Sequence, residues 1–226
     1  MLRVIVGAIL LASGGAALCE PETGTRFDKK PMAVTDSAND PVVSKVVNRY
    51  ARCVANSKPQ WADGVLAMQF LSEEQTRAAN KGVSGLQSCF STSQFDLKFS
   101  FLSLLGGLAE QRITERFGDK DVSGLSAITD EQLFSSAAAP KTTTDDFAMC
   151  IARKDPVTVR RLIASEPITS QETQLIQSLV PHLSGCLPSG LNIKLNKQTV
   201  RAYSAVGLYY LLAHDADLAP ANAKRN

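Results

Sequence analysis

The chain carries two cysteine pairs with the same spacing, and this repetition constrains its fold more than any other feature. Cys53 and Cys89 are 36 residues apart, and so are Cys150 and Cys186. When the chain is shifted by 97 residues against itself, Tyr50-Ala51-Arg52-Cys53 lies over Phe147-Ala148-Met149-Cys150. We therefore predict two copies of one helical unit, over residues 41–116 and 145–214, joined by a connector over residues 117–144.

Helix-start signals coincide in the two copies. Ser72-Glu73-Glu74-Gln75 lies over Thr169-Ser170-Gln171-Glu172, and both have the Ser/Thr-x-x-Glu/Gln pattern of a capping box. Phe95 to Phe99 and Leu191 to Leu195 then alternate apolar and polar residues, which predicts a short strand in each copy. Ser100 and Asn196 follow as N-caps of long helices. Each unit of this mainly α fold is predicted to contain three helices, a short strand and a fourth helix.

The two short strands are candidates to pair with each other, because a lone strand leaves backbone groups unpaired along both of its edges. We therefore consider a small two-stranded β ribbon that joins the copies.

Residues 1–19 have the pattern of a secretory signal peptide. Arg3 precedes an apolar stretch, which is followed by small residues. Cleavage after Ala17 and cleavage after Cys19 both fit, and we favour the second because it leaves an even number of cysteines. The alternative is a lipoprotein acylated on Cys19, although the bulky Leu18 suits that signal poorly. The apolar stretch is too short to span a membrane, and we expect a secreted or periplasmic protein without a transmembrane segment.

Four cysteines allow three pairings, and the repeated spacing favours Cys53 with Cys89 and Cys150 with Cys186. Each disulfide would then close one unit. A four-cysteine zinc site is the alternative, but zinc ligands occur in close pairs two to four residues apart, and these cysteines do not. The exported location also favours disulfides.

Three segments lie outside the two units. Residues 20–40 are polar with scattered proline and glycine, so we predict an extended or disordered arm. The connector contains a short helix predicted from Thr129 to Ser136, and then a threonine run that ends at Asp145 as the acidic cap of the next helix. Residues 215–226 are predicted to be a flexible tail.

The sequence shows no catalytic, metal or cofactor motif, so we lean against an enzyme and expect no cofactor. The two histidines, His182 and His214, occur late in predicted helices, where structural or surface roles explain them. The remaining charged feature is a cluster of four cations around the turn between the first two helices of the second unit, at Arg153, Lys154, Arg160 and Arg161. We interpret this cluster as a candidate binding patch.

The formal net charge is only +2, whereas nucleic-acid-binding proteins are usually strongly basic. An envelope protein or an anionic polymer is therefore the expected partner of the patch. The leading hypothesis is an exported, non-catalytic helical binding or interaction module of the bacterial envelope. The alternative is a hydrolase or small-molecule carrier with a site in the cleft between the two units. A deep pocket with convergent acids and a perturbed carboxyl pKa would favour the alternative, and a flat apolar patch beside Arg160 would favour the first hypothesis.

Overall fold

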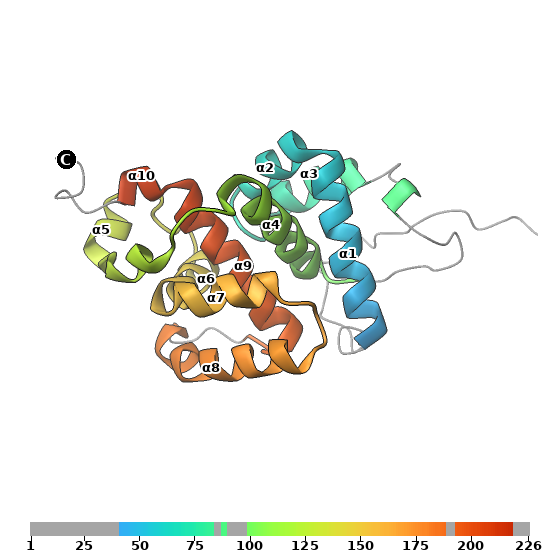
Figure 1. Ribbon diagram of the computed structural model, residues 1–226. Coiled ribbons are helices and arrows are strands. Elements are labelled where there is room, and N and C mark those ends of the chain that lie inside the picture. Colours follow the sequence, from blue (N-terminus) through green and yellow to red (C-terminus); the bar gives the residue numbers. More distant parts are fainter. Residues whose placement is uncertain (1–40, 84–86, 90–98, 189–192, 219–226) are drawn as a thin grey trace, which may run out of the picture.

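The computed structural model describes residues 41–83, 87–89, 99–188 and 193–218, and this part of the chain is mainly helical (Figure 1). The first half contains α1 (Pro41–Ser57), α2 (Pro59–Leu66), α3 (Glu73–Val83), the 3-10 turn η2 (Gln87–Cys89) and α4 (Phe101–Phe117). The connector contains η3 (Ser123–Ala127) and α5 (Asp130–Phe134). The second half contains α6 (Thr143–Lys154), α7 (Pro156–Ala164), α8 (Ser170–Cys186), α9 (Lys197–Ala213) and α10 (Asp215–Leu218).

The helices α4 and α9 form the centre of the molecule. They pack against each other, and each also packs against the first helix of its own half, α1 for α4 and α6 for α9. Figure 1 shows α9 running between α4 on one side and α6 to α8 on the other. The core is continuous from one half to the other, so neither half closes a core by itself.

Small residues let these central helices approach closely. A Cβ atom on Gly106 would come within 2.7 Å of the Cβ atom of Ala202, and a Cβ atom on Gly207 would collide with the carbonyl group of Ala148. Glycine is required at both positions because the neighbouring backbone occupies the space of a side chain.

Both disulfides join the cysteines that the repeated spacing pairs. Cys53 in α1 is bonded to Cys89 in η2, and Cys150 in α6 is bonded to Cys186 at the end of α8, with Cα–Cα distances of 5.7 Å and 5.6 Å. Each bond ties the first helix of a half to the segment that follows or ends its third helix.

The predicted N-caps are present with one exception, but the capping boxes at Ser72 and Thr169 are half formed, because the side chains of Gln75 and Glu172 accept from the Leu71 and Ile168 N–H groups instead. Ser100 accepts a hydrogen bond from the Ser103 N–H, and Asn196 accepts one from the Thr199 N–H. Thr129 begins α5 with a capping box. The prediction for α6 was wrong: Thr142 is its N-cap, and Asp145 is the third helical residue, whose carboxylate accepts hydrogen bonds from the backbone before the helix.

No strand occurs in the described residues. Residues 95–98, 191 and 192 lie outside them, whereas Ile193 to Leu195 form an irregular segment that leads into α9. The predicted arm over residues 20–40 also lies outside the described residues. The tail differs from the prediction at its beginning, because residues 215–218 form α10 and the Leu218 side chain packs into the core.

A candidate ligand cavity between α2, α6 and α9

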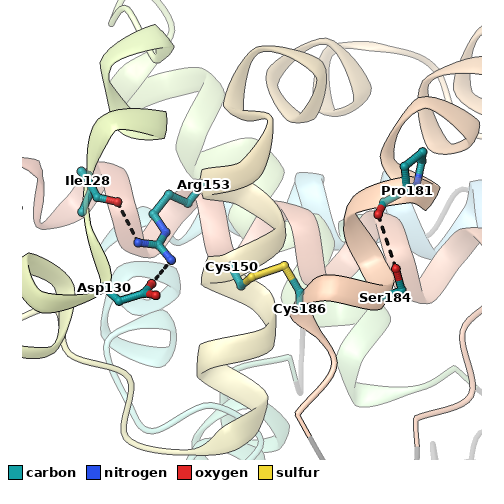
Figure 2. Close-up of a disulfide and its surroundings, with 7 residues drawn as sticks. All are labelled: Ile128, Asp130, Cys150, Arg153, Pro181, Ser184 and Cys186. Atoms are coloured by element: carbon teal, nitrogen blue, oxygen red, sulfur yellow. Dashed lines mark hydrogen bonds and ion pairs between the residues drawn. A yellow bond between two sulfur atoms is a disulfide. The ribbon is translucent and has the colours of Figure 1, made fainter.

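The predicted basic patch is divided by the fold. The guanidinium group of Arg153 donates a hydrogen bond of 2.7 Å to the Ile128 carbonyl and forms an ion pair with Asp130, both in or next to the connector (Figure 2). Arg160 donates a longer hydrogen bond, of 3.4 Å, to the Lys120 carbonyl, and burial lowers its pKa. Lys154 and Arg161 are exposed. Two of the four cations thus fasten the connector to α6 and α7, and two face solvent.

A cavity of about 360 Å³ lies beside α6, between the two halves. This volume is within the range of about 300 to 1,000 Å³ that is usual for small-molecule sites. Its walls come from α2 and the following loop, the end of α4, the segment before α6, and the last two turns of α9. The buried part of its lining contains Leu66, Phe70, Ala138, Asp145, Met149 and Tyr209.

The exposed rim of the cavity is mostly small or polar. It contains Ala67, Gln69, Ala137, Lys141 and Ala213. The cavity therefore opens between alanines and a few polar residues, and its interior is largely apolar with a few polar groups in fixed places. This combination is typical of small-molecule sites.

The loop after α2 holds Phe70 in the cavity wall. Phe70 makes edge-on contacts with the rings of Tyr203 and Tyr210, at centroid distances of 5.9 Å and 6.2 Å. The next residue, Leu71, has a left-handed backbone with φ of 58°, and its N–H donates to the side-chain oxygen of Gln75 at 2.7 Å. This tight turn reverses the chain before α3 and fixes the ring of Phe70 against α9.

Asp145 is the buried carboxylate of the cavity, and it is only 4% exposed. Its Oδ2 atom accepts hydrogen bonds from the Lys141 and Thr142 N–H groups at 2.9 Å and 3.1 Å. Its Oδ1 atom is buried and has no hydrogen-bond partner. An unsatisfied buried acceptor of this kind is uncommon and costs stability.

The hydroxyl group of Tyr210, also in the cavity wall, is the second buried group without a partner. The Gln75 amide, which is bonded to the Leu71 N–H and to the Val65 carbonyl, lies beside this hydroxyl and acts to lower the pKa of Tyr210. Two oxygen atoms of the cavity wall, Asp145 Oδ1 and Tyr210 Oη, thus have no hydrogen bond of normal geometry.

Burial shifts the proton affinity of both groups. It raises the pKa of Asp145, although the hydrogen bonds from Lys141 and Thr142 act in the opposite direction. It also raises the pKa of Tyr210, and the charge of Asp145 adds to this effect. The charge of Asp145 therefore acts on the Tyr210 hydroxyl across the cavity wall.

Asp63, the other carboxylate of the cavity, is fully engaged. Arg112 binds it with two hydrogen bonds, of 2.9 Å and 3.0 Å, and Arg116 and the Tyr209 hydroxyl contact its Oδ1 atom. Burial acts to raise the pKa of Asp63, but these hydrogen bonds outweigh it, so the pKa lies below its usual value. Burial and the charge of Asp63 raise the pKa of Tyr209 to about 12.

A second polar cluster lies between α1, α4, α8 and α9, on the opposite side of the central helix pair. Arg201 donates two hydrogen bonds to Glu110, of 2.6 Å and 2.9 Å, and one of 3.0 Å to Glu172. Asn48 donates to the same Glu110 carboxylate. The space beside this cluster is about 30 Å³, the size of a single water molecule. The cluster is a closed ion network that links the halves.

Sequence reasoning missed both clusters. It assigned Gln75, Glu172 and Asp145 to helix starts, where each is the third residue after the N-cap, but their side chains are also buried in polar sites. One signal was present: Glu110 directly follows an apolar run in α4, and Arg201 is a charged residue among mostly apolar residues of α9, and such residues are rarely buried unless paired.

Comparison of the chain with protein-family models, curated proteins and solved structures gives no match. Within the described ranges, no helix is long and apolar enough to cross a membrane. The same residues contain no group of three or more histidine, cysteine or acidic side chains that could hold a metal ion. The candidate site therefore rests on the cavity and its two unsatisfied polar groups.

Proposed function

We propose that this protein is an exported, non-catalytic helical module of the bacterial envelope that binds a small molecule in the cavity between α2, α6 and α9. One observation carries the proposal: the cavity has apolar and aromatic walls, and two buried oxygens of its lining residues, Asp145 Oδ1 and Tyr210 Oη, lack hydrogen-bond partners. A buried polar group without a partner is costly, and a bound ligand would offset this cost.

We also propose that the module arose by tandem duplication. Leu71 and Ile168, 97 residues apart, both have left-handed backbones, with φ of 58° and 63°. Their N–H groups donate at 2.7 Å to the side chains of Gln75 and Glu172, which are again 97 residues apart. Bulky residues seldom adopt this conformation, so its occurrence twice at one offset, beside two equivalent disulfides, supports a common origin.

An exported location agrees with the disulfides, which persist in oxidising compartments, and with the signal-like first 19 residues. We place the protein in the periplasm or outside the cell. Lys154 and Arg161 are the cations left for a surface contact with an envelope protein or an anionic polymer.

Hydrolysis is the second candidate, because the pKa of Asp145 is raised while that of Asp63 is lowered. Acid and base roles are often divided between carboxyl groups in this way. However, Asp63 is held by two arginines and a tyrosine, which leaves it poorly placed to act as a base or nucleophile. Binding is the function that this geometry favours.

The proposal is tested by thermal unfolding in the presence of the low-molecular-mass fraction of a cell-envelope extract. A ligand that binds the folded state raises the melting temperature. The Ala213→Trp variant is the control, because it enlarges an exposed rim residue and obstructs the opening. We expect the extract to stabilise the wild-type protein and to leave the variant unchanged. Equal responses of the two proteins, or no response of the wild type, would reject the cavity as a binding site.

A further inference from the structure

We infer that the cavity recognises a small organic amine whose protonated nitrogen binds the carboxylate of Asp145 and whose apolar body lies against the cavity walls. This inference rests on the proposed function and names the ligand class of the same site. The argument begins with the charges that line the cavity.

The charged side chains of the lining differ in whether they are paired. Asp63 and Arg116 form an ion pair with each other at 3.1 Å, and Arg112 completes the coordination of Asp63. Lys141 is exposed at the rim, where water weakens its charge, and it acts on Asp145 only against the larger effect of burial. Asp145 is the buried charged group of the lining with an unpartnered oxygen. A ligand that satisfies it must supply a hydrogen-bond donor, and a positively charged donor forms the stronger bond.

In the polar cluster on the other side of the repeat, a side chain of the protein itself occupies the corresponding position. At the offset of 97 residues, Asn48 corresponds to Asp145, and Gln75 corresponds to Glu172. In the cluster of Asn48 and Glu172 the guanidinium group of Arg201 occupies the centre, bonded to Glu110 and Glu172. Among the described residues no guanidinium bonds Asp145 or Gln75, and the space beside Asp145 is a cavity of about 360 Å³ instead of about 30 Å³. A cation of the ligand would bind Asp145 in the way that Arg201 binds Glu110 and Glu172 in the other cluster.

The walls suit the body of an amine. Leu66 and Met149 provide apolar surface, and the aromatic rings of Phe70, Tyr209 and Tyr210 line the same cavity. Aromatic faces attract ammonium groups. An anionic ligand would instead meet the charge of a buried carboxylate, and the lining cations Arg116 and Lys141 would offset this repulsion only from the paired and exposed positions that they occupy.

The Oδ1 atom of Asp145 is covered by protein in this structure. The ammonium group therefore meets it after a rotation of the carboxylate about its terminal bond. This torsion has a broad energy minimum for aspartate, but the rotation also moves Oδ2 relative to the Lys141 and Thr142 N–H groups, so binding must offset the weakening of these two hydrogen bonds.

Isothermal titration calorimetry on the full chain at pH 7 tests the inference with three probes of similar size: hexylamine, hexan-1-ol and hexanoate. We expect wild-type protein to bind hexylamine about ten-fold or more tightly than hexan-1-ol, as a charge-assisted hydrogen bond implies. Binding of hexanoate should be the weakest of the three.

Asp145→Asn should remove the preference for hexylamine over hexan-1-ol. Asp146→Asn is the matched control, since it removes the same charge from the next residue of α6, which does not line the cavity. This control should keep the preference. Circular dichroism melting curves establish that each variant is folded.

Equal binding of hexylamine and hexan-1-ol by the wild type, a preference for hexanoate, or an unchanged preference in Asp145→Asn would each overturn the inference. The proposed function fails separately. If the envelope extract stabilises the wild type but not Ala213→Trp while hexylamine shows no preference, the cavity binds a ligand of another class. If neither the extract nor any probe binds, both proposals are wrong.

Discussion

Asp145 performs a structural role with one oxygen and leaves the other without a partner. Its Oδ2 atom receives the Lys141 and Thr142 N–H groups that precede α6, whereas Oδ1 is buried and unbonded. An asparagine at this position could keep the first role through its carbonyl oxygen and would not bury a charge. Asn48, its counterpart in the other half, is such a residue and donates to Glu110 at 2.9 Å. The carboxylate thus costs stability, which is common at binding sites.

We predict that Asp145→Asn stabilises the protein at neutral pH by an amount that depends on pH. The pKa of the Asp145 carboxyl group is raised in the folded state. As the pH rises, this group therefore loses its proton at a lower pH in the unfolded chain than in the folded protein. The contribution of Asp145 to the free energy of unfolding falls as the pH rises above the unfolded pKa of about 4, and it stays low above the folded pKa. Urea unfolding of both proteins from pH 4 to pH 7 should show that the free energy of unfolding of the variant rises relative to that of the wild type. A constant difference across this range would contradict the assigned environment of Asp145.

Arg201 illustrates a different kind of buried charge, one that is completely paired. Arg201→Met should lower the free energy of unfolding by about 3–5 kcal/mol, because Glu110 and Glu172 would remain buried without their cation. Arg161→Met is the control, since Arg161 is exposed and surface changes usually stay within about 0.5 kcal/mol. Chemical denaturation compares the two variants. Similar losses from both would mean that the buried network contributes little.

At the scale of elements, the turns before α3 and α8 combine a feature that the sequence predicts with one that it does not. The capping Ser72 and Thr169 accept hydrogen bonds from the N–H groups of Gln75 and Glu172, as expected. The left-handed residues before them, Leu71 and Ile168, were not expected, because leucine and isoleucine seldom adopt this conformation. The tertiary fold imposes it, through the side-chain oxygens that bind their N–H groups.

Replacing Ile168 with glycine tests this strain. A left-handed backbone costs a residue other than glycine about 1–2 kcal/mol, and glycine costs about 0.5–1 kcal/mol in chain entropy. We therefore expect Ile168→Gly to leave stability unchanged or to raise it by up to about 1 kcal/mol. Val180→Gly is the comparison: the side chain of Val180 is also exposed, but it lies within α8, where glycine is unfavourable. A higher melting temperature for Val180→Gly than for Ile168→Gly would contradict this interpretation.

At the scale of the whole molecule, the sequence predicts the helical class, the disulfide pairing and most helix starts, because caps and cysteine spacing are local or repeated signals. The cavity and the Arg201 network are not predictable in this way. They depend on how α4 and α9 cross, and this crossing brings Glu110 to Arg201 across 91 residues of chain. The basic patch could not be assessed from the sequence for the same reason. The spacing of its residues along the chain does not reveal that Arg153 binds the Ile128 carbonyl and Asp130 in the connector.

Each disulfide closes a loop of 36 residues, and the loop model gives about 3–4 kcal/mol of stabilisation for each. The double variants Cys53→Ser/Cys89→Ser and Cys150→Ser/Cys186→Ser should each lose a large part of that amount. Because the two halves share one core, both variants should still unfold in a single transition. Two separate transitions by calorimetry would show that the halves are independent.

The central claim is that the cavity between the halves holds a small molecule, and native mass spectrometry of the protein purified from its own cell envelope tests it most directly. We predict a wild-type protein that carries one additional small mass per chain, and an Ala213→Trp variant, purified in parallel, that lacks this mass. The ligand-free mass for both proteins, or the same additional mass on both, would contradict the claim.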